Sequence, residues 1–180
     1  MRIITGIYKG RRFDIPRSFK ARPTTDFAKE NIFNVLKGYL EFEGCEALDL
    51  FSGTGSISLE LLSRGCKMVS SVELDREHAA FIRQCVEKLG ITNHLLVRGD
   101  AFKFMQKCRQ KFDFIFADPP YSLDNLAEIP AQVFAHELLK DGGILVLEHG
   151  EHHDFSTNPY FFDHRTYGSV NFSLFKKSAG

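Results

Sequence analysis

No apolar run in this 180-residue chain is longer than a β-strand, and the chain has no tryptophan. A helix that crosses a bilayer needs about 20 consecutive apolar residues, so the composition argues against a membrane protein. The first ten residues lack the apolar core of a secretory signal, which predicts a cytoplasmic location. The four cysteines stand singly, without a Cys-x-x-Cys pair, so we expect reduced thiols and no metal site.

What remains is the composition of an ordinary globular domain. The chain is 43% hydrophobic, which is enough for one domain with a sizeable core. Its net charge is zero, but residues 1–24 carry seven basic side chains against one acid, so this basic arm is +6 and the remaining 156 residues are −6. The asymmetry favours a polyanionic partner, with a solvated tail as the alternative. The basic side chains are Arg2, Lys9, Arg11, Arg12, Arg17, Lys20 and Arg22.

The spacing of apolar residues predicts an alternation of strands and helices. Residues 2–15 form a short hairpin that turns at Lys9-Gly10, and a helix covers residues 24–40. From residue 46 onward, this pattern predicts an open parallel sheet whose ligands bind at the carboxyl ends of the strands. The expected strands span residues 46–51, 67–73, 94–98, 112–117 and 143–149, followed by a hairpin over 161–175. The other expected helices span residues 55–64, 76–89, 101–108 and 130–139.

The first of these strands ends in a turn that suits an anionic ligand. Gly53 and Gly55 let the backbone bend tightly, and the helix that follows offers free N–H groups to a phosphate or a carboxylate. Ser58 stands where a dinucleotide-binding turn would have its third glycine. A plain strand-to-helix turn is the alternative. The segment reads Asp49-Leu50-Phe51-Ser52-Gly53-Thr54-Gly55.

Acidic side chains follow the next two strands. Glu73 comes 18 residues after Gly55, where a carboxylate can accept both hydroxyls of a ribose, whereas Asp75 suits a helix cap. Asp100, before Ala101, can accept from the amino group of an adenine, although it too is placed to cap a helix. The three strand ends together predict a pocket for an adenosine cofactor with a carboxylate tail.

The fourth strand ends in Asp118-Pro119-Pro120-Tyr121, the most specific motif in the chain. Consecutive prolines lack N–H groups and fix φ, so this backbone is rigid and its carbonyls are free to accept. Asp118 adds a side-chain acceptor, and Tyr121 adds an aromatic face for stacking on a planar ring. Acceptors beside an aromatic platform favour the amino group of a nucleobase over a plain turn.

These motifs, in this order, resemble class I S-adenosylmethionine-dependent amino-methyltransferases. The opening MRIITGIYKGRRF, the run Arg22-Pro23-Thr24-Thr25-Asp26 and the run Asn31-Ile32-Phe33-Asn34 are similar to the start of bacterial RsmD-type methyltransferases. That family methylates the N2 of a guanine in small-subunit (16S) ribosomal RNA. Tyr167-Gly168-Ser169 is similar too, so the resemblance covers essentially the whole chain.

The resemblance implies a Rossmann-like α/β fold. It predicts a mixed, mostly parallel seven-stranded sheet with helices on both faces and a C-terminal antiparallel hairpin. Residues 1–40 would be a hairpin-and-helix extension packed on a methyltransferase domain of residues 41–180. S-adenosylmethionine would be the cofactor, and ribosomal RNA or the small ribosomal subunit the partner of a monomeric enzyme.

The resemblance also implies a role for each motif. The cofactor would contact Asp49, Phe51, Ser52, Gly53, Gly55, Glu73, Leu74, Asp100 and Ala101. The target base would be held by the catalytic residues Asp118, Pro119, Pro120 and Tyr121. Methyl transfer would then be a direct in-line displacement, and the basic arm would hold RNA phosphates without reading sequence.

Four other functions stay open at this stage. A DNA adenine-N6 methyltransferase shares Asp-Pro-Pro-Tyr, but 180 residues leave little room for a target-recognition domain. Methyltransferases for protein glutamine usually have Asn in place of Asp118, and a dehydrogenase is disfavoured by Ser58. A non-catalytic RNA-binding assembly factor would not need the complete set of pocket residues.

Overall fold

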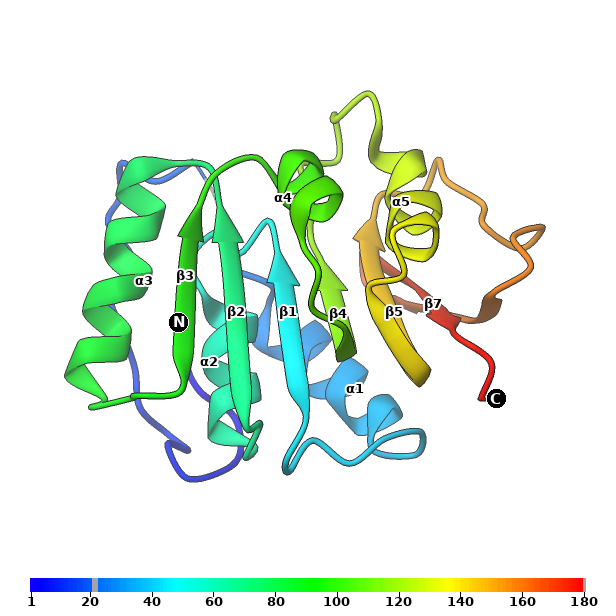
Figure 1. The fold of residues 1–180 in the computed structure, drawn as a ribbon. Helices are drawn as coiled ribbons and strands as arrows, with labels where there is room; N and C mark the ends of the chain where they lie inside the picture. The colour runs from blue at the N-terminus through cyan, green and yellow to red at the C-terminus, as the bar shows by residue number, and fades with distance from the viewer. Residues whose placement is uncertain (21–22, 180) are drawn as a thin grey trace.

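The computed structural model describes residues 1–20 and 23–179, and the prediction made for Arg22 lies outside them. A seven-stranded sheet with the strand order β3-β2-β1-β4-β5-β7-β6 forms the centre of the molecule (Figure 1). Strands β1 to β5 are parallel, and β7 pairs antiparallel with both β5 and β6. This confirms the predicted mixed sheet with its C-terminal hairpin. The strands are β1 (Glu46–Leu50), β2 (Met68–Glu73), β3 (His94–Arg98), β4 (Phe112–Ala117), β5 (Leu139–His149), β6 (Phe161–Tyr167) and β7 (Val170–Lys176).

Helices cover both faces of the sheet, as predicted. One hydrophobic cluster joins α1, α2, α3 and the N-terminal segment to one face, and a second joins α4 and α5 to the other. Ile3, Phe13 and Phe19 of the N-terminal segment belong to the first cluster, so this segment packs directly on the main core. None of the helices in the described ranges has the length and apolarity that a bilayer crossing requires. The helices are α1 (Asp26–Leu36), α2 (Ser56–Ser63), α3 (Arg76–Lys88), α4 (Ala101–Lys107), α5 (Ile129–Ala135) and the 3-10 turn η1 (Leu126–Glu128).

The predicted N-terminal hairpin is short: one antiparallel bridge joins Arg2 and Arg12, with backbone hydrogen bonds between the two arms on either side of it. The backbone N–H groups of Ile4 and Thr5, which a longer hairpin would pair across its strands, donate instead to the carboxylate of Glu60 at 2.8 and 3.1 Å. Glu60 belongs to α2, so the segment gives up strand pairing to bond to a helix. The expectation of a regular hairpin was therefore wrong in extent.

Two predicted helices end earlier than expected. Helix α1 begins after Thr25, whose hydroxyl accepts from the N–H of Ala28, and it ends at Leu36 rather than at residue 40 because the chain turns at Gly38. Helix α5 ends at Ala135, and after a turn over residues 136–138 the chain enters β5 at Leu139 rather than at residue 143. Leu139 already pairs with Phe112 of β4, and a register shift before Phe114 lets the strand continue.

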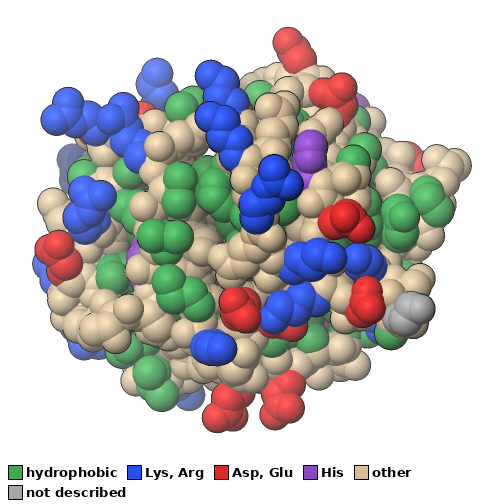
Figure 2. All heavy atoms as spheres, in the orientation of Figure 1, with side chains coloured by type: hydrophobic (Ala, Val, Ile, Leu, Met, Phe, Trp, Pro, Cys, Tyr) green, Lys and Arg blue, Asp and Glu red, His purple; other side chains and the backbone are tan. Residues whose placement is uncertain are grey.

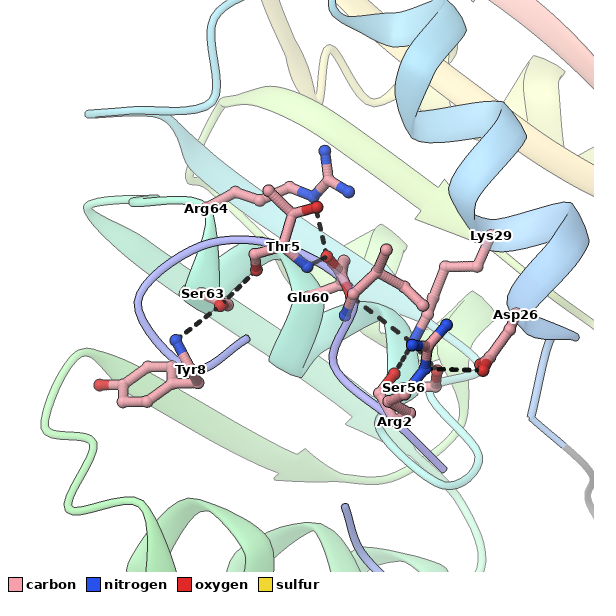
Figure 3. Close-up of polar contacts among 10 residues, drawn as sticks. Arg2, Thr5, Tyr8, Asp26, Lys29, Ser56, Glu60, Ser63 and Arg64 are labelled. Carbon is pink, nitrogen blue, oxygen red and sulfur yellow. Dashed lines mark hydrogen bonds and ion pairs between the residues drawn. The ribbon is translucent and has the colours of Figure 1, made fainter. Parts of the chain in front are cut away.

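A buried ionic network fastens the N-terminal segment to α1 and α2 (Figure 3). Its centre is the fully buried Glu60, whose carboxylate also accepts from Arg64 Nε at 2.9 Å. Lys29 Nζ lies 3.5 Å from Glu60 Oε1 and donates to the carbonyl of Arg2 at 2.6 Å and the hydroxyl of Ser56 at 2.9 Å. One carboxylate thus holds two cations and two backbone amides, which joins three segments that are distant in sequence.

Candidate active site

The strand order changes direction between β1 and β4, and the carboxyl ends of these strands border a cavity of about 980 Å³. Open α/β sheets bind their ligands at such a switch point. Of the residues that the sequence singles out, Gly55 does not line the cavity, and Lys20 is the one member of the basic arm, among its described residues, that does. The structure brings together at this cavity Asp49, Phe51, Ser52, Gly53, Glu73, Leu74, Asp100, Ala101, Asp118, Pro119, Pro120 and Tyr121.

The turn after β1 is shaped by residues in the left-handed region. Phe51 has φ of 58°, Gly53 of 57° and Gly55 of 81°. Non-glycine residues rarely adopt this conformation, so the backbone at Phe51 is strained and must be stabilised by the surrounding structure. A Cβ atom on Gly55 would lie 2.9 Å from Ile82 Cγ1, so this glycine allows α2 to pack closely against α3. Gly55 therefore shapes the turn on the side that faces α3, while Phe51 and Gly53 line the cavity.

Glu73 is fixed at the end of β2 by two backbone amides. Its Oε1 accepts from the N–H of Gly53 at 2.6 Å, and its Oε2 accepts from the N–H of Asp75 at 2.8 Å. Each carboxylate oxygen has a second lone pair, so the side chain can still accept from a ligand in the cavity. Asp75 caps α3 as expected, by accepting from the N–H of His78 at 2.9 Å.

Asp100 caps α4, because its Oδ1 accepts from the N–H of Lys103 at 3.0 Å. The capping alternative weighed from the sequence is thus correct for one oxygen of this carboxylate. Asp100 and Ala101 nevertheless line the cavity, next to β3, and the cap fixes the direction in which the carboxylate faces. The residue can serve both as a helix cap and as a ligand acceptor.

Glu148 is a site residue that the sequence reasoning missed. It lies near the end of β5, is 6% exposed and lines the same cavity. Its Oε1 accepts from the hydroxyl of Thr24 at 3.0 Å, and its Oε2 accepts from the hydroxyl of Tyr121 at 3.0 Å. The signal that could have identified Glu148 was an acidic residue near the end of an apolar strand that neighbours the strand leading to Asp118. Glu148 ties the start of α1 to the Asp-Pro-Pro-Tyr loop.

Three carboxylates, those of Asp49, Asp118 and Glu148, converge at the cavity between β1, β4 and β5. Burial raises the pKa of Asp49 to about 7, although the Ser58 hydroxyl donates to its Oδ2 at 2.6 Å and partly opposes the shift. Burial, followed by the charges of Glu148 and Asp49, raises the pKa of Asp118 well above its ordinary value. Such a cluster is stabilised by a cationic ligand or by protons.

Within the described part of the chain, no group of three or more His, Cys, Asp or Glu side chains is arranged to hold a metal ion. Ser58, the residue in place of a third glycine, has instead become a buried hydrogen-bond partner of Asp49.

The Asp-Pro-Pro-Tyr loop presents an aromatic ring beside this acidic cluster. The N–H of Asp118 donates to the carbonyl of Leu50 at 3.3 Å, which ties the start of the loop to β1. Pro119 is buried, and the side chain of Tyr121 is 45% exposed with its hydroxyl held by Glu148. A ring anchored at its hydroxyl and open on one side is suited to stacking on a planar ligand.

The described basic side chains of the arm lie mostly on the surface. Arg2 is half-buried and pairs with Asp26 at 3.0 Å. On the face drawn in Figure 2, Lys and Arg side chains gather at the upper left, above α3 and the carboxyl end of β3. The exposed members of the arm are Lys9, Arg11, Arg12, Arg17 and Lys20.

The sequence matches the model of the family described as conserved hypothetical protein 95 over residues 1–176. The chain belongs to this family, the RsmD family. The resemblance recognised from its motifs is thereby confirmed. A relative named ribosomal RNA small subunit methyltransferase D, from Haemophilus influenzae, is 30% identical over 98% of this chain and 93% of its own length.

Solved structures agree with the RsmD fold of the chain. A candidate methyltransferase from Escherichia coli is 27% identical, superposes with a TM-score of 0.87 and covers 100% of this chain and 99% of its own. A more distant candidate methyltransferase, solved in complex with SAH, is 18% identical with a TM-score of 0.67 and covers 82% of this chain and 49% of its own. The second likeness concerns the fold alone.

Proposed function

We propose that this RsmD-family protein transfers a methyl group from S-adenosylmethionine to the exocyclic N2 amino group of a guanine in small-subunit ribosomal RNA. The observation that carries the proposal is that the Asp118 carboxylate and the Tyr121 ring line the same cavity. The names of the relatives supply the RNA class. Residues 1–40 would act as the RNA-holding extension of the methyltransferase domain formed by residues 41–180.

The cavity has the groups that such a cofactor requires. The acidic cluster suits a positively charged sulfonium centre, and Glu73 is placed to accept the hydroxyls of a ribose. Asp100 and Ala101 suit the adenine, and the N-terminus of α2 suits the carboxylate of the methionine part. A distant neighbour of the same fold was solved in complex with SAH, which fits S-adenosylmethionine as a ligand of this fold.

Bound there, S-adenosylmethionine supplies an electrophilic methyl group on a positively charged sulfur. The chain's own residues position the acceptor. Asp118 accepts a hydrogen of the guanine amino group, which turns the nitrogen lone pair toward the methyl and stabilises the positive charge that develops on nitrogen. Tyr121 stacks on the base, and Glu148 holds the Tyr121 hydroxyl and thereby the plane of the ring. A base in a duplex cannot reach this cavity, so the target is unpaired or flipped out.

Nucleoside mass spectrometry of ribosomal RNA from cells that lack this protein tests the proposal. We expect the loss of one N2-methylguanosine from the small-subunit RNA and its return when the gene is restored. Unchanged ribosomal RNA together with a loss of N6-methyladenine from DNA would favour the DNA methyltransferase alternative. Calorimetric titration with S-adenosylhomocysteine and with NAD separates a methyltransferase from a dehydrogenase.

Replacing Glu73 by Ala should weaken cofactor binding and leave RNA binding unchanged. Losing a charged hydrogen-bond partner of the ribose costs about 1.5–3 kcal/mol, which calorimetry with S-adenosylhomocysteine can measure. Glu77→Ala is the matched control, because Glu77 is an exposed glutamate in the first turn of α3. Wild-type affinity in the Glu73→Ala variant would mean that Glu73 only fixes the turns around Gly53 and Asp75.

Replacing Arg11, Arg12 and Arg17 together by Ala should weaken RNA binding and flatten its salt dependence. If all three side chains contact phosphates, the log–log slope of affinity against salt should fall by roughly two to three units. Cofactor affinity should not change, because none of the three lines the cavity.

The matched control removes three exposed cations elsewhere, at Lys107, Arg109 and Lys111 between α4 and the start of β4. These lie at the amino end of β4, away from the cavity. If the slope of RNA affinity against salt falls equally in both triple variants, the arm contributes only its general positive charge and makes no specific phosphate contacts.

A further inference from the structure

Helix α1 starts beside the active site and carries an exposed aromatic ring that has no role in the proposed reaction as described so far. Thr24, three residues before Phe27, donates its hydroxyl to Glu148 inside the site. Phe27 lies in the first turn of α1, and its side chain is 63% exposed to water. The helix start that Glu148 anchors therefore carries a large apolar ring to the surface beside the cavity.

A second ring supports Phe27 from the C-terminal hairpin. Tyr167, the last residue of β6, meets Phe27 edge to face, with ring centroids 6.1 Å apart and planes at 90°. The hairpin turns directly after Tyr167, and Asn171 on the returning strand pairs with His149, the neighbour of Glu148. The pair thus lies at the same end of the sheet as the carboxylate cluster.

A second ring pair in the molecule can be compared with Phe27 and Tyr167. At the opposite end of β6, Tyr39 and Phe162 form a similar edge-to-face pair at 5.0 Å between the region after α1 and the hairpin. Both pairs lie where α1 and the turn after it contact β6. Tyr39 is 43% exposed and carries a hydroxyl, whereas Phe27 has no polar group and leaves more of its surface in water. The contact with Tyr167 therefore leaves most of the Phe27 side chain uncovered.

The charges around this ring suit a nucleic acid. Arg2 neutralises Asp26, the residue before Phe27, and its backbone bridges to Arg12, which is exposed. Lys20, also exposed, lines the cavity, as Thr24 does. The helix start that carries the ring thus contacts the basic arm through the Arg2–Asp26 ion pair and the cavity through Thr24.

We propose that Phe27, supported by Tyr167, is the stacking platform for the RNA base next to the target guanine. The inference rests on the proposed function and adds a second base-binding position to it. Turning the guanine into the cavity breaks its stacking on a neighbouring base, and an aromatic face outside the cavity replaces that contact. Stacking on an aromatic side chain tolerates any base, so the platform would fix the flanking nucleotide without reading it.

The first test measures KM and binding affinity for small ribosomal subunits isolated from cells that lack this protein. Phe27→Ala should raise both KM and Kd about 5- to 100-fold, the range for one lost base–aromatic stack, with little change in cofactor affinity. Phe27→Leu keeps apolar contact with Tyr167 but has no aromatic face, so it should behave like Phe27→Ala, while Phe27→Trp should bind at least as well as wild type. Tyr39→Ala is the matched control and should leave both constants unchanged.

The second test uses the absence of tryptophan from the chain. Phe27→Trp introduces a single fluorophore, and protein-free small-subunit RNA should quench its emission in a saturable way, whereas Tyr39→Trp should not respond. Wild-type KM in both Phe27→Ala and Phe27→Leu, or RNA binding without quenching of Phe27→Trp, would overturn the platform. A failure of the proposed function looks different, since wild-type protein would then transfer no methyl group to these subunits.

Discussion

Replacing Asp118 by Ala is expected to slow single-turnover methyl transfer about 10²–10³-fold, while cofactor affinity stays within a few-fold. The expected loss follows from position. Asp118 lies directly after β4, ahead of two prolines, and the cavity carboxylates whose charges act on it are those of Glu148 and Asp49. Its carboxylate gains importance as positive charge develops on the amino nitrogen, so removing it affects the transition state more than the ground state. The measurement is transfer of labelled methyl to small-subunit RNA.

Two related variants make this prediction specific. Asp118→Asn should be milder than Asp118→Ala, because an amide oxygen can still accept one hydrogen bond. Since burial and the charge of Glu148 raise the pKa of Asp118, the wild-type rate should fall as the pH drops, at a higher pH than for an ordinary carboxylate. Glu148→Gln removes one of these charges and should move that midpoint to lower pH. A full rate in Asp118→Ala would contradict the assignment of this loop to the active site.

Replacing Glu60 by Ala is expected to lower the free energy of unfolding by about 3–5 kcal/mol, the usual result of removing one partner from a buried ionic network. The side chain is fully buried, and its loss leaves Lys29 and Arg64 without their shared carboxylate. It also strips the N–H groups of Ile4 and Thr5 of their acceptor. Urea unfolding followed by circular dichroism measures the change.

Lys29→Met should cost less than Glu60→Ala, because Glu60 would keep Arg64 and both backbone amides. The matched control is Arg165→Ala, which breaks a partly exposed ion pair with Asp163 and should have an effect near zero. If Glu60→Ala and Arg165→Ala unfold at the same urea concentration, the buried network does not hold the N-terminal segment in place.

The alternation of strands and helices and the family of the chain can both be predicted from the amino-acid sequence. Periodicity reports which face of each element is buried, and this is a local property that adjacent residues express. The strand over 94–98 and the strand over 112–117 were predicted with the bounds that the structure has. Parallel strands end at one edge, so acids and glycines placed after them had to meet, as Asp49, Glu73 and Asp118 do at the cavity.

The side chains that complete the site and anchor the arm come from distant parts of the chain, and the fold alone brings them together. The hydrogen bond from Thr24 to Glu148 joins residues 124 apart, and the bond from Ile4 to Glu60 joins residues 56 apart. Nothing in the local pattern marks Glu60 as buried, because a glutamate in a helix normally faces water. Its burial depends on Lys29, Arg64 and two amides arriving from other elements, and such contacts exist only once the chain has packed. For the same reason the N-terminal segment bonds to α2 where its own pattern favoured a hairpin.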